Sequence, residues 1–185
     1  MARQAVVKYQ SRVKRALEMK QGDDLWIVMG KTSAWSNEAS PDAPLPGTTT
    51  IVEPIVAIKA TIKSLANEIT EEAYLLLAEA ERAAVVIDEV MVYLQLVADE
   101  DAYTDAARYL YLKVTYDPVI EGHPAFTSFR VYYVTSGLTP AAGYESVDWL
   151  VPANVDDYGL VEYENSGLSI LGGTAISLPV VIEFR

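Results

Sequence analysis

Residues 107–116 read ARYLYLKVTY, and residues 126–135 read FTSFRVYYVT. In the first stretch, apolar side chains (Leu110, Leu112 and Val114) alternate with tyrosine, lysine and threonine, which is the period-two pattern of a half-buried strand. Aromatic and β-branched residues are frequent in both stretches, and these residue types favour strands. The segment between them, DPVIEGHP, contains proline and glycine and predicts a loop that joins the two strands as a hairpin.

Further strands are predicted on both sides of this hairpin. Residues 24–30, DLWIVMG, form a short apolar run that ends in glycine, which favours a buried strand. Residues 55–66, IVAIKATIKSLA, alternate imperfectly and also predict a strand. Residues 159–164 and 178–184 are the strand candidates near the C-terminus.

Two stretches have helical spacing. In residues 3–20 apolar side chains recur at steps of three and four, and Gly22 is a plausible stop. Residues 68–84 are rich in Ala, Glu and Leu and predict a second helix. The β-branched residues that follow predict a hairpin of residues 84–87 and 90–97, with one continuous helix as the alternative.

These elements predict an α+β protein that is predominantly antiparallel β, sandwich-like, with an N-terminal helix and one further helix. The 185 residues suit one domain, so we expect a basic helix or arm over residues 1–22 and a single β-rich domain over residues 23–185. Residues 31–54 are rich in Ser, Thr and Pro. Because proline fits neither a helix interior nor a central strand, this segment predicts a long loop or arm.

The composition excludes several kinds of site and partner. The chain has no cysteine, which excludes disulfides, thiolate nucleophiles and cysteine-bound zinc. His123 is the only histidine, so no metal site can use several imidazoles. A net charge of −12 argues against a nucleic-acid partner. The sequence contains neither a signal-peptide pattern nor a long uncharged apolar segment, so we expect no membrane contact and synthesis in the cytoplasm.

Three motifs suggest chemistry, but each lacks a required part. Gly30-Lys31-Thr32 resembles the end of a phosphate-binding loop, but Leu25 stands where that loop needs glycine. The aspartates of residues 99–105 have calcium-loop spacing without the glycine and glutamate of such a loop, leaving adventitious calcium as the alternative. His123 has no Gly-x-Ser-x-Gly partner motif. The sequence therefore predicts no enzyme, with no catalytic residue, cofactor or metal.

Basic residues are concentrated in the first part of the chain. Residues 1–31 contain seven basic and three acidic residues, a net charge of +4, whereas the rest carries −16. We expect Arg12, Lys14 and Arg15 of the N-terminal helix to contact an acidic neighbour. The alternative is a helix packed on its own domain with a solvated basic face.

Aromatic residues suggest a second type of contact. Twelve tyrosines and three tryptophans exceed what a core of this size needs, and both types are enriched at protein interfaces. The candidate interface residues are Trp26, Trp35, Tyr109, Tyr111 and Tyr132. The alternative is that many of these side chains are ordinary half-buried strand residues.

The segment DDLWIVMGKTSAWSNEASPDAPLP, residues 23–46, resembles a pattern in baseplate wedge proteins of contractile-tailed (myovirus) bacteriophages. In that family a short strand ends in a Gly-basic-Ser/Thr element, which is followed by a Trp-Ser-Asn/Asp-Glu stretch and Pro-rich sequence. An apolar strand at residues 179–184 and the elements at residues 107–116, 129–136 and 150–154 are also similar. The larger proteins of this kind carry an inserted domain that this chain lacks.

The resemblance implies a mainly β fold without enzymatic activity, homodimers or higher oligomers, and a place in the virion tail. It therefore predicts a baseplate wedge component that holds neighbouring tail and baseplate proteins together. A neck or tail-fibre adaptor protein and a stand-alone carbohydrate- or peptide-binding module are the alternatives. In the first case we expect the basic N-terminal segment to dock on the acidic face of another subunit or tail protein.

Overall fold

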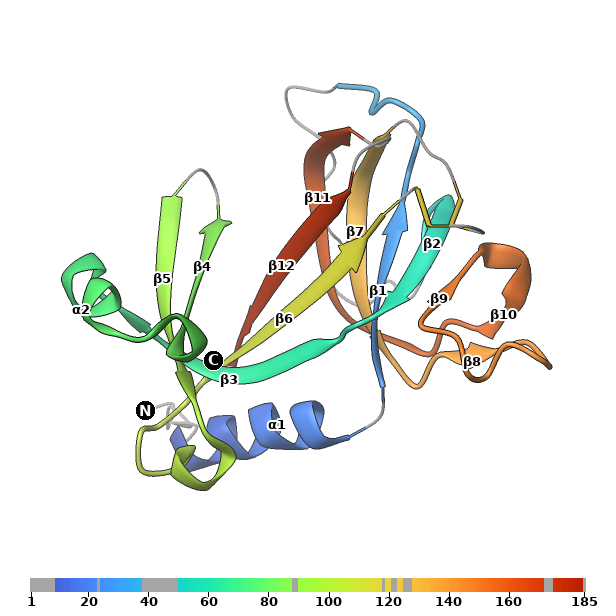
Figure 1. The fold of residues 1–185 in the computed structure, drawn as a ribbon. Helices are drawn as coiled ribbons and strands as arrows, with labels where there is room; N and C mark the ends of the chain where they lie inside the picture. The colour runs from blue at the N-terminus through green and yellow to red at the C-terminus, as the bar shows by residue number, and fades with distance from the viewer. Residues whose placement is uncertain are drawn as a thin grey trace, which may run out of the picture. The chain divides into compact units, whose positions relative to one another are not determined.

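The two tyrosine-rich stretches form the strands β6 (Tyr109–Tyr116) and β7 (Ser128–Ser136), as predicted (Figure 1). The predicted hairpin between them is wrong, because β6 lies between β12 and β3 in one sheet and β7 lies between β11 and β1 in another. Each strand has a neighbour on both sides and buries side chains on both faces. In β6, the rings of Tyr109 and Tyr111 are buried as well as the leucines that alternate with them.

This computed structural model describes residues 9–22, 24–37, 50–87, 90–117, 119–120, 123–124, 128–171 and 175–184, with the backbone alone for residues 166–171. The chain forms two compact units. The first comprises Met1–Gly22, Ile62–Lys113 and Pro179–Arg185, and the second comprises Asp23–Thr61 and Val114–Leu178. The boundaries fall between elements at two points and within β6 and β12 (Ile176–Glu183) at the others.

The first unit is built on a five-stranded sheet with the order β12-β6-β3-β5-β4. Its remaining strands are β3 (Ile62–Ile69), β4 (Arg82–Ile87) and β5 (Val90–Val97). Helix α1 (Tyr9–Gln21) packs against this sheet through Val13 and Ala16, which are fully buried beside Leu65 and Val97. The predicted N-terminal helix is therefore confirmed from Tyr9 onward, and residues 3–8 lie outside the described residues.

The predicted hairpin of residues 84–87 and 90–97 is confirmed. Strands β4 and β5 pair antiparallel from Arg82 opposite Gln95 to Ile87 opposite Val90. Strand β3 pairs with β5 only from Tyr93 onward, so the last part of the hairpin has no third strand among the described residues. The two residues of the turn itself, 88 and 89, are outside the described part of the chain.

The predicted helix over residues 68–84 is wrong for most of its length. Residues 68 and 69 end β3, and only α2 (Glu71–Leu76) is α-helical. The Thr70 hydroxyl accepts a hydrogen bond from the Ala73 backbone N–H at 3.3 Å and so starts the helix after the strand. A short 3-10 helix, η1 (Glu79–Glu81), follows, and β4 begins at Arg82. The alanines and leucines of this stretch have high helix propensity, but the sheet on either side limits the helix to six residues.

The predicted strand over residues 55–66 is two strands. Strand β2 (Pro54–Lys59) belongs to the sheet of the second unit, whereas β3 belongs to the first unit. The chain leaves β2 at Ala60, whose N–H donates to the Leu25 carbonyl oxygen at 2.8 Å. The imperfect alternation of this stretch therefore reflects a change of sheet.

The second unit contains a five-stranded sheet with the order β11-β7-β1-β2-β9. Its central strand β1 (Leu25–Gly30) buries all six residues, which confirms the prediction of a buried strand. The further strands are β9 (Trp149–Leu150) and β11 (Leu160–Leu171), and a small ribbon pairs β8 (Thr139–Pro140) with β10 (Val155–Asp157) next to the 3-10 helix η3 (Pro152–Asn154). Trp26, Val28, Val131, Tyr133 and Leu150 form the centre of its core.

The Pro-rich segment 31–54 is described at its two ends. The N–H of Lys31 donates to the carbonyl oxygens of Val52 at 3.1 Å and Glu53 at 3.0 Å, so the two ends meet. The Glu53 carboxylate accepts from the Ser33 hydroxyl at 2.6 Å and from the Ser33 N–H at 3.1 Å. These hydrogen bonds hold the pKa of the Glu53 carboxyl below its ordinary value. The segment therefore leaves and rejoins the sheet at one fixed point.

The predicted fold class is confirmed, since the described residues form mostly antiparallel strands, with α1 and the short α2 as their α-helices. A separate domain over residues 1–22 and a single one over residues 23–185 stay predictions.

Candidate interaction surfaces

The three basic residues predicted on the N-terminal helix differ in their surroundings. Lys14 is exposed and lies 3.4 Å from Glu18, one turn further along α1. Arg15 is exposed and forms no ion pair with a described residue. Arg12 is half-buried and lines a groove between α1 and the sheet. The basic face therefore splits into a solvated part and a part turned toward the protein.

The C-terminal end of α1 is fixed by its own sheet. Lys20 forms an ion pair with Asp99 of the 3-10 helix η2 (Asp99–Asp101), and Gln21 donates to the same carboxylate at 3.2 Å. The hydrogen bond from Lys20 lowers the pKa of Asp99. Lys20 therefore forms its ion pair within the first unit. This agrees with the alternative interpretation, in which the helix packs on its own domain.

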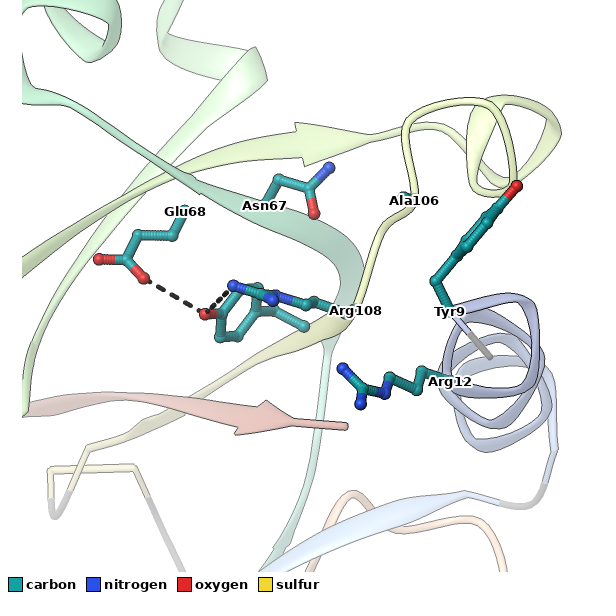
Figure 2. A pocket seen from close by; sticks show the side chains of 7 residues that line it. Tyr9, Arg12, Asn67, Glu68, Ala106 and Arg108 are labelled. Carbon is teal, nitrogen blue, oxygen red and sulfur yellow. Dashed lines mark hydrogen bonds between the residues drawn. The ribbon is translucent and has the colours of Figure 1, made fainter. Parts of the chain in front are cut away.

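The groove has a volume of about 400 Å³ and lies wholly within the first unit (Figure 2). It is lined by residues of α1, of the end of β3 and of the segment that enters β6: Tyr9, Arg12, Asn67, Glu68, Ala106, Arg108 and Tyr109. Arg12 comes from α1 and Arg108 from the segment that enters β6, and Figure 2 shows the Arg108 guanidinium directed toward Glu68. Arginines from two distant parts of the sequence therefore border one groove, which Glu68 also lines.

Arg108 is held in position by its neighbour in β6. Its Nη2 donates to the Tyr109 hydroxyl at 3.3 Å, and its guanidinium carbon lies 5.3 Å from the centre of the Tyr109 ring. The Tyr109 hydroxyl donates in turn to Glu68 Oε2 at 3.2 Å. Burial raises the pKa of Tyr109, so the phenol stays protonated and can donate to Glu68. The hydrogen bonds from Arg108 to Tyr109 and from Tyr109 to Glu68 hold these three side chains together along one wall of the groove.

Arg12 has no comparable partner. Its Nε is buried and forms no hydrogen bond in the part of the chain that the structure describes. A buried donor left in this state costs about 1–3 kcal/mol relative to a satisfied one. Neither Arg12 nor Arg108 forms an ion pair with a described residue. The groove can therefore accept an anionic group at its Arg12 end.

A second groove, of about 540 Å³, differs in this respect. It also lies within the first unit and includes Tyr74, Arg82, Tyr111 and Lys113 in its lining. Its arginine is already paired, since Arg82 Nη1 donates to the Tyr74 carbonyl oxygen at 2.8 Å and its guanidinium lies 4.6 Å from the centre of the Tyr74 ring. This groove offers no unsatisfied arginine.

The aromatic residues predicted at an interface are mostly buried in the chain's own core. The exposed fractions of Trp26, Tyr109, Tyr111 and Tyr132 are 8% or less. Trp35 is half-buried, with the Lys31 ammonium 4.4 Å from its ring centre. Their role at an interface stays a prediction, but four of the five offer little side-chain surface to a partner.

An apolar surface that the sequence analysis missed lies at the end of the β4–β5 hairpin. It comprises four exposed side chains, with Val86 and Met91 on one face of the hairpin and Ile87 and Val90 on the other. Leu75 and Leu76 of α2 are also exposed, and Tyr74 of α2 packs on Tyr93 of β5 with ring centres 4.9 Å apart. The sequence of the predicted hairpin could have indicated this surface, because its strands are apolar at successive positions rather than at alternate ones.

The motifs that resembled chemical sites have ordinary structural surroundings. Lys31 donates through its amine to the Ser33 hydroxyl at 3.0 Å, and residues 31–37 form no helix. The His123 ring lies between Tyr116 and Trp149, 5.1 Å and 4.8 Å from their ring centres. Among the described residues no three His, Asp or Glu side chains are placed to hold a metal ion. No described helix is both long enough and apolar enough to cross a bilayer.

Comparisons with known proteins cover nearly the whole chain. A family model described as baseplate wedge 3 tail fiber network component matches residues 4–184. The chain is 30% identical over 165 residues to "Virion protein 3" of Enterococcus phage phiEF24C, an alignment that spans 86% of this chain and 82% of that protein.

Proposed function

The chain belongs to the baseplate wedge 3 tail fiber network component family, and from that membership we propose that it is a wedge component that holds neighbouring tail proteins together. Its family and its relative make it a structural protein of a phage tail. The wedge position and the contacts are the proposal, which includes no catalytic step.

The observation that carries the proposal is the exposed apolar end of the β4–β5 hairpin. Val86 and Val90 are each 62% exposed, and Met91 is 48% exposed. A two-stranded ribbon in water is only marginally stable, and clustered apolar side chains on a protein surface usually mark a contact site. A hairpin with this surface is best explained by a protein that covers it in the assembled particle.

The sheet edge beside this surface supports the same conclusion. Strand β4 is the last strand of its sheet among the described residues, and residues 83–87 carry no charge or proline. Proteins normally protect such edges with charged residues, proline or a bulge, because an open edge pairs with other chains. An extended segment of a neighbouring tail protein could add to the open edge of β4 beside Val86. Val90 of β5 lies on the opposite face of the hairpin and would be covered by a different part of that protein. Carbohydrates need polar partners for their hydroxyl groups, which this surface does not offer.

The experiment is the substitution of Val86 and Val90 by lysine in the phage genome. Because both side chains are exposed, we expect the variant protein to fold, but the charged groups would have to be buried under the partner. The measurement is the ratio of this protein and its neighbours in purified particles, by quantitative mass spectrometry. We expect few complete tails.

Leu160→Lys is the matched control, since Leu160 is 57% exposed on β11 of the second unit. It should assemble normally if the hairpin is the contact. Circular dichroism of both purified variants verifies the fold. Complete tails at the wild-type level with Val86→Lys/Val90→Lys would contradict the proposed contact.

A further inference from the structure

We infer that the groove between α1 and the sheet of the first unit binds a carboxylate side chain from an acidic segment of a neighbouring tail protein. Arg12 and Arg108 would hold this carboxylate between them. The inference rests on the proposed function, because it assigns one contact of a structural tail protein to a specific site. The sequence predicted that the basic face of α1 contacts an acidic neighbour, and this inference assigns that contact to Arg12 and Arg108 instead.

The unsatisfied Arg12 is the first argument. Its buried Nε donates to no described residue, and its side chain forms no ion pair there. Guanidinium groups bind carboxylates through paired N–H donors, and such charge-assisted bonds are the stronger hydrogen bonds in proteins. A carboxylate placed in the groove would contact the Arg12 side chain, which lines it and forms no ion pair with a described residue.

The second argument is that Arg108 is positioned in advance. Tyr109 supports its guanidinium through a hydrogen bond of 3.3 Å and through the face of the ring. A side chain that is already ordered loses little entropy on binding, so the site favours binding by preorganisation. Arg12 comes from α1 and Arg108 from the residue before β6, so two different elements supply the arginines that border the groove (Figure 2).

The charges of the groove favour a carboxylate over a phosphate group. Glu68 lines the same groove and binds the Tyr109 hydroxyl, and Glu183 of β12 acts electrostatically on Tyr109. These two carboxylates repel a dianion more strongly than a single negative charge. The chain's net charge of −12 also disfavours a nucleic acid, which carries one charge per roughly 1.7 Å of duplex. A single carboxylate side chain of a protein segment meets less repulsion inside the groove and fits best.

The first experiment uses the purified full-length chain and a hexaglutamate peptide as the probe. NMR spectra of the arginine Nε–H groups report on each guanidinium separately. We expect hexaglutamate to shift the Arg12 and Arg108 signals in a saturable way. Arg12→Gln should weaken this binding about tenfold, as the loss of one charge-assisted hydrogen-bonded pair predicts.

Arg15→Gln is the matched control, because Arg15 lies on the same helix, is exposed and does not line the groove. It should bind hexaglutamate as the wild type does. Inorganic phosphate and a DNA duplex are the other probes. The inference fails if hexaglutamate leaves both arginine signals unchanged, or if phosphate or DNA shifts them at lower concentration than hexaglutamate does.

The second experiment identifies the protein that lies next to the groove in the assembled particle. A photo-crosslinking amino acid replaces Tyr9, which is 54% exposed and lines the groove. We expect it to react with an Asp- or Glu-containing segment of another tail protein. We also expect Arg12→Glu and Arg108→Glu each to reduce incorporation, and reversal of the cross-linked acidic residue to lysine to restore it.

Cross-links to a second copy of this chain or to DNA would overturn the assignment of the partner. Arg15→Glu is the control here, and a loss of incorporation as large as that of Arg12→Glu would show a general charge effect and overturn the site. The two proposals fail separately. If Val86→Lys/Val90→Lys blocks assembly while the groove variants assemble normally, the contact function stands and the groove inference is wrong.

Discussion

Gly30 ends strand β1 at a position that has no room for a side chain. A Cβ atom at Gly30 would lie 2.5 Å from the Val52 carbonyl oxygen and 3.4 Å from Val131 Cγ1. The oxygen belongs to the backbone where the Pro-rich segment returns to the sheet, so it cannot move without shifting that segment. Gly30 therefore couples the sheet of the second unit to the ends of the loop.

Gly30→Ala should destabilise the protein by about 1–3 kcal/mol, because the added methyl group overpacks a closed contact. Urea unfolding followed by tryptophan fluorescence measures the change. Met29→Leu in the same strand conserves volume and should leave the unfolding midpoint nearly unchanged. A midpoint for Gly30→Ala equal to that of the wild type would contradict the close approach.

At the level of single residues, the sequence indicated one of the two arginines that line the groove. Arg12 was a candidate because basic residues are concentrated near the N-terminus. Arg108 gave no such signal, since it begins a strand far along the chain and only the packing of α1 on the sheet brings the two together. The tyrosines show the opposite case. Tyr109 and Tyr111 were predicted at an interface because of their residue type, but both are buried in the core.

At the level of elements, the anchoring of α1 depends on the ion pair between Lys20 and Asp99. Val13 and Ala16 supply the apolar contact of the helix, and Asp99 binds its last turn. The pKa of Asp99 is lowered in the folded protein, so folding favours the ionised carboxylate. Its contribution to stability is therefore complete above the unfolded-state pKa and is lost as the pH falls through the folded-state pKa.

Asp99→Asn should lower the free energy of unfolding at pH 7 by about 1 kcal/mol or less, since the pair is only partly buried. The difference between wild type and variant should shrink below pH 4, the ordinary range of an aspartate, as Asp99 becomes protonated in the wild type. Urea unfolding at several pH values measures both. Glu100→Gln, at the exposed neighbouring position, is the control. A difference that does not change with pH would contradict the ionic origin.

The pattern of apolar residues in the sequence identified most strands, but it did not predict which strands pair with one another. The buried run of β1 and the β-branched hairpin β4–β5 were predicted because the local sequence determines them. The helix of residues 68–84 was overestimated, because propensity carries no information about the strands that limit α2 on both sides. The hairpin between β6 and β7 failed for a related reason, since a loop with proline and glycine can lead to another sheet as well as back to the same one.

For the whole molecule, the net charge of −12 opposes contact between copies. The homo-oligomer expected from the family resemblance would therefore form through weakly charged surface. Repulsion between like-charged molecules falls as salt shortens the screening length, from about 30 Å at 0.01 M to about 8 Å at 0.15 M.

Self-association of the purified chain should consequently increase with sodium chloride concentration. Analytical ultracentrifugation at low and moderate salt measures the average mass. An average mass that falls with added salt would mean that opposite charges, rather than apolar contacts, hold the copies together.

The division of the chain into its two units also bears on how the protein is made. The first unit takes its strands from the middle of the sequence and from Pro179–Arg185, whereas the second takes Asp23–Thr61 and Val114–Leu178. A growing polypeptide on the ribosome therefore lacks the β12 segment of the first unit until residues Val114–Leu178 of the second unit have been made. Until then β6 has an open edge, which exposes the nascent chain to mispairing.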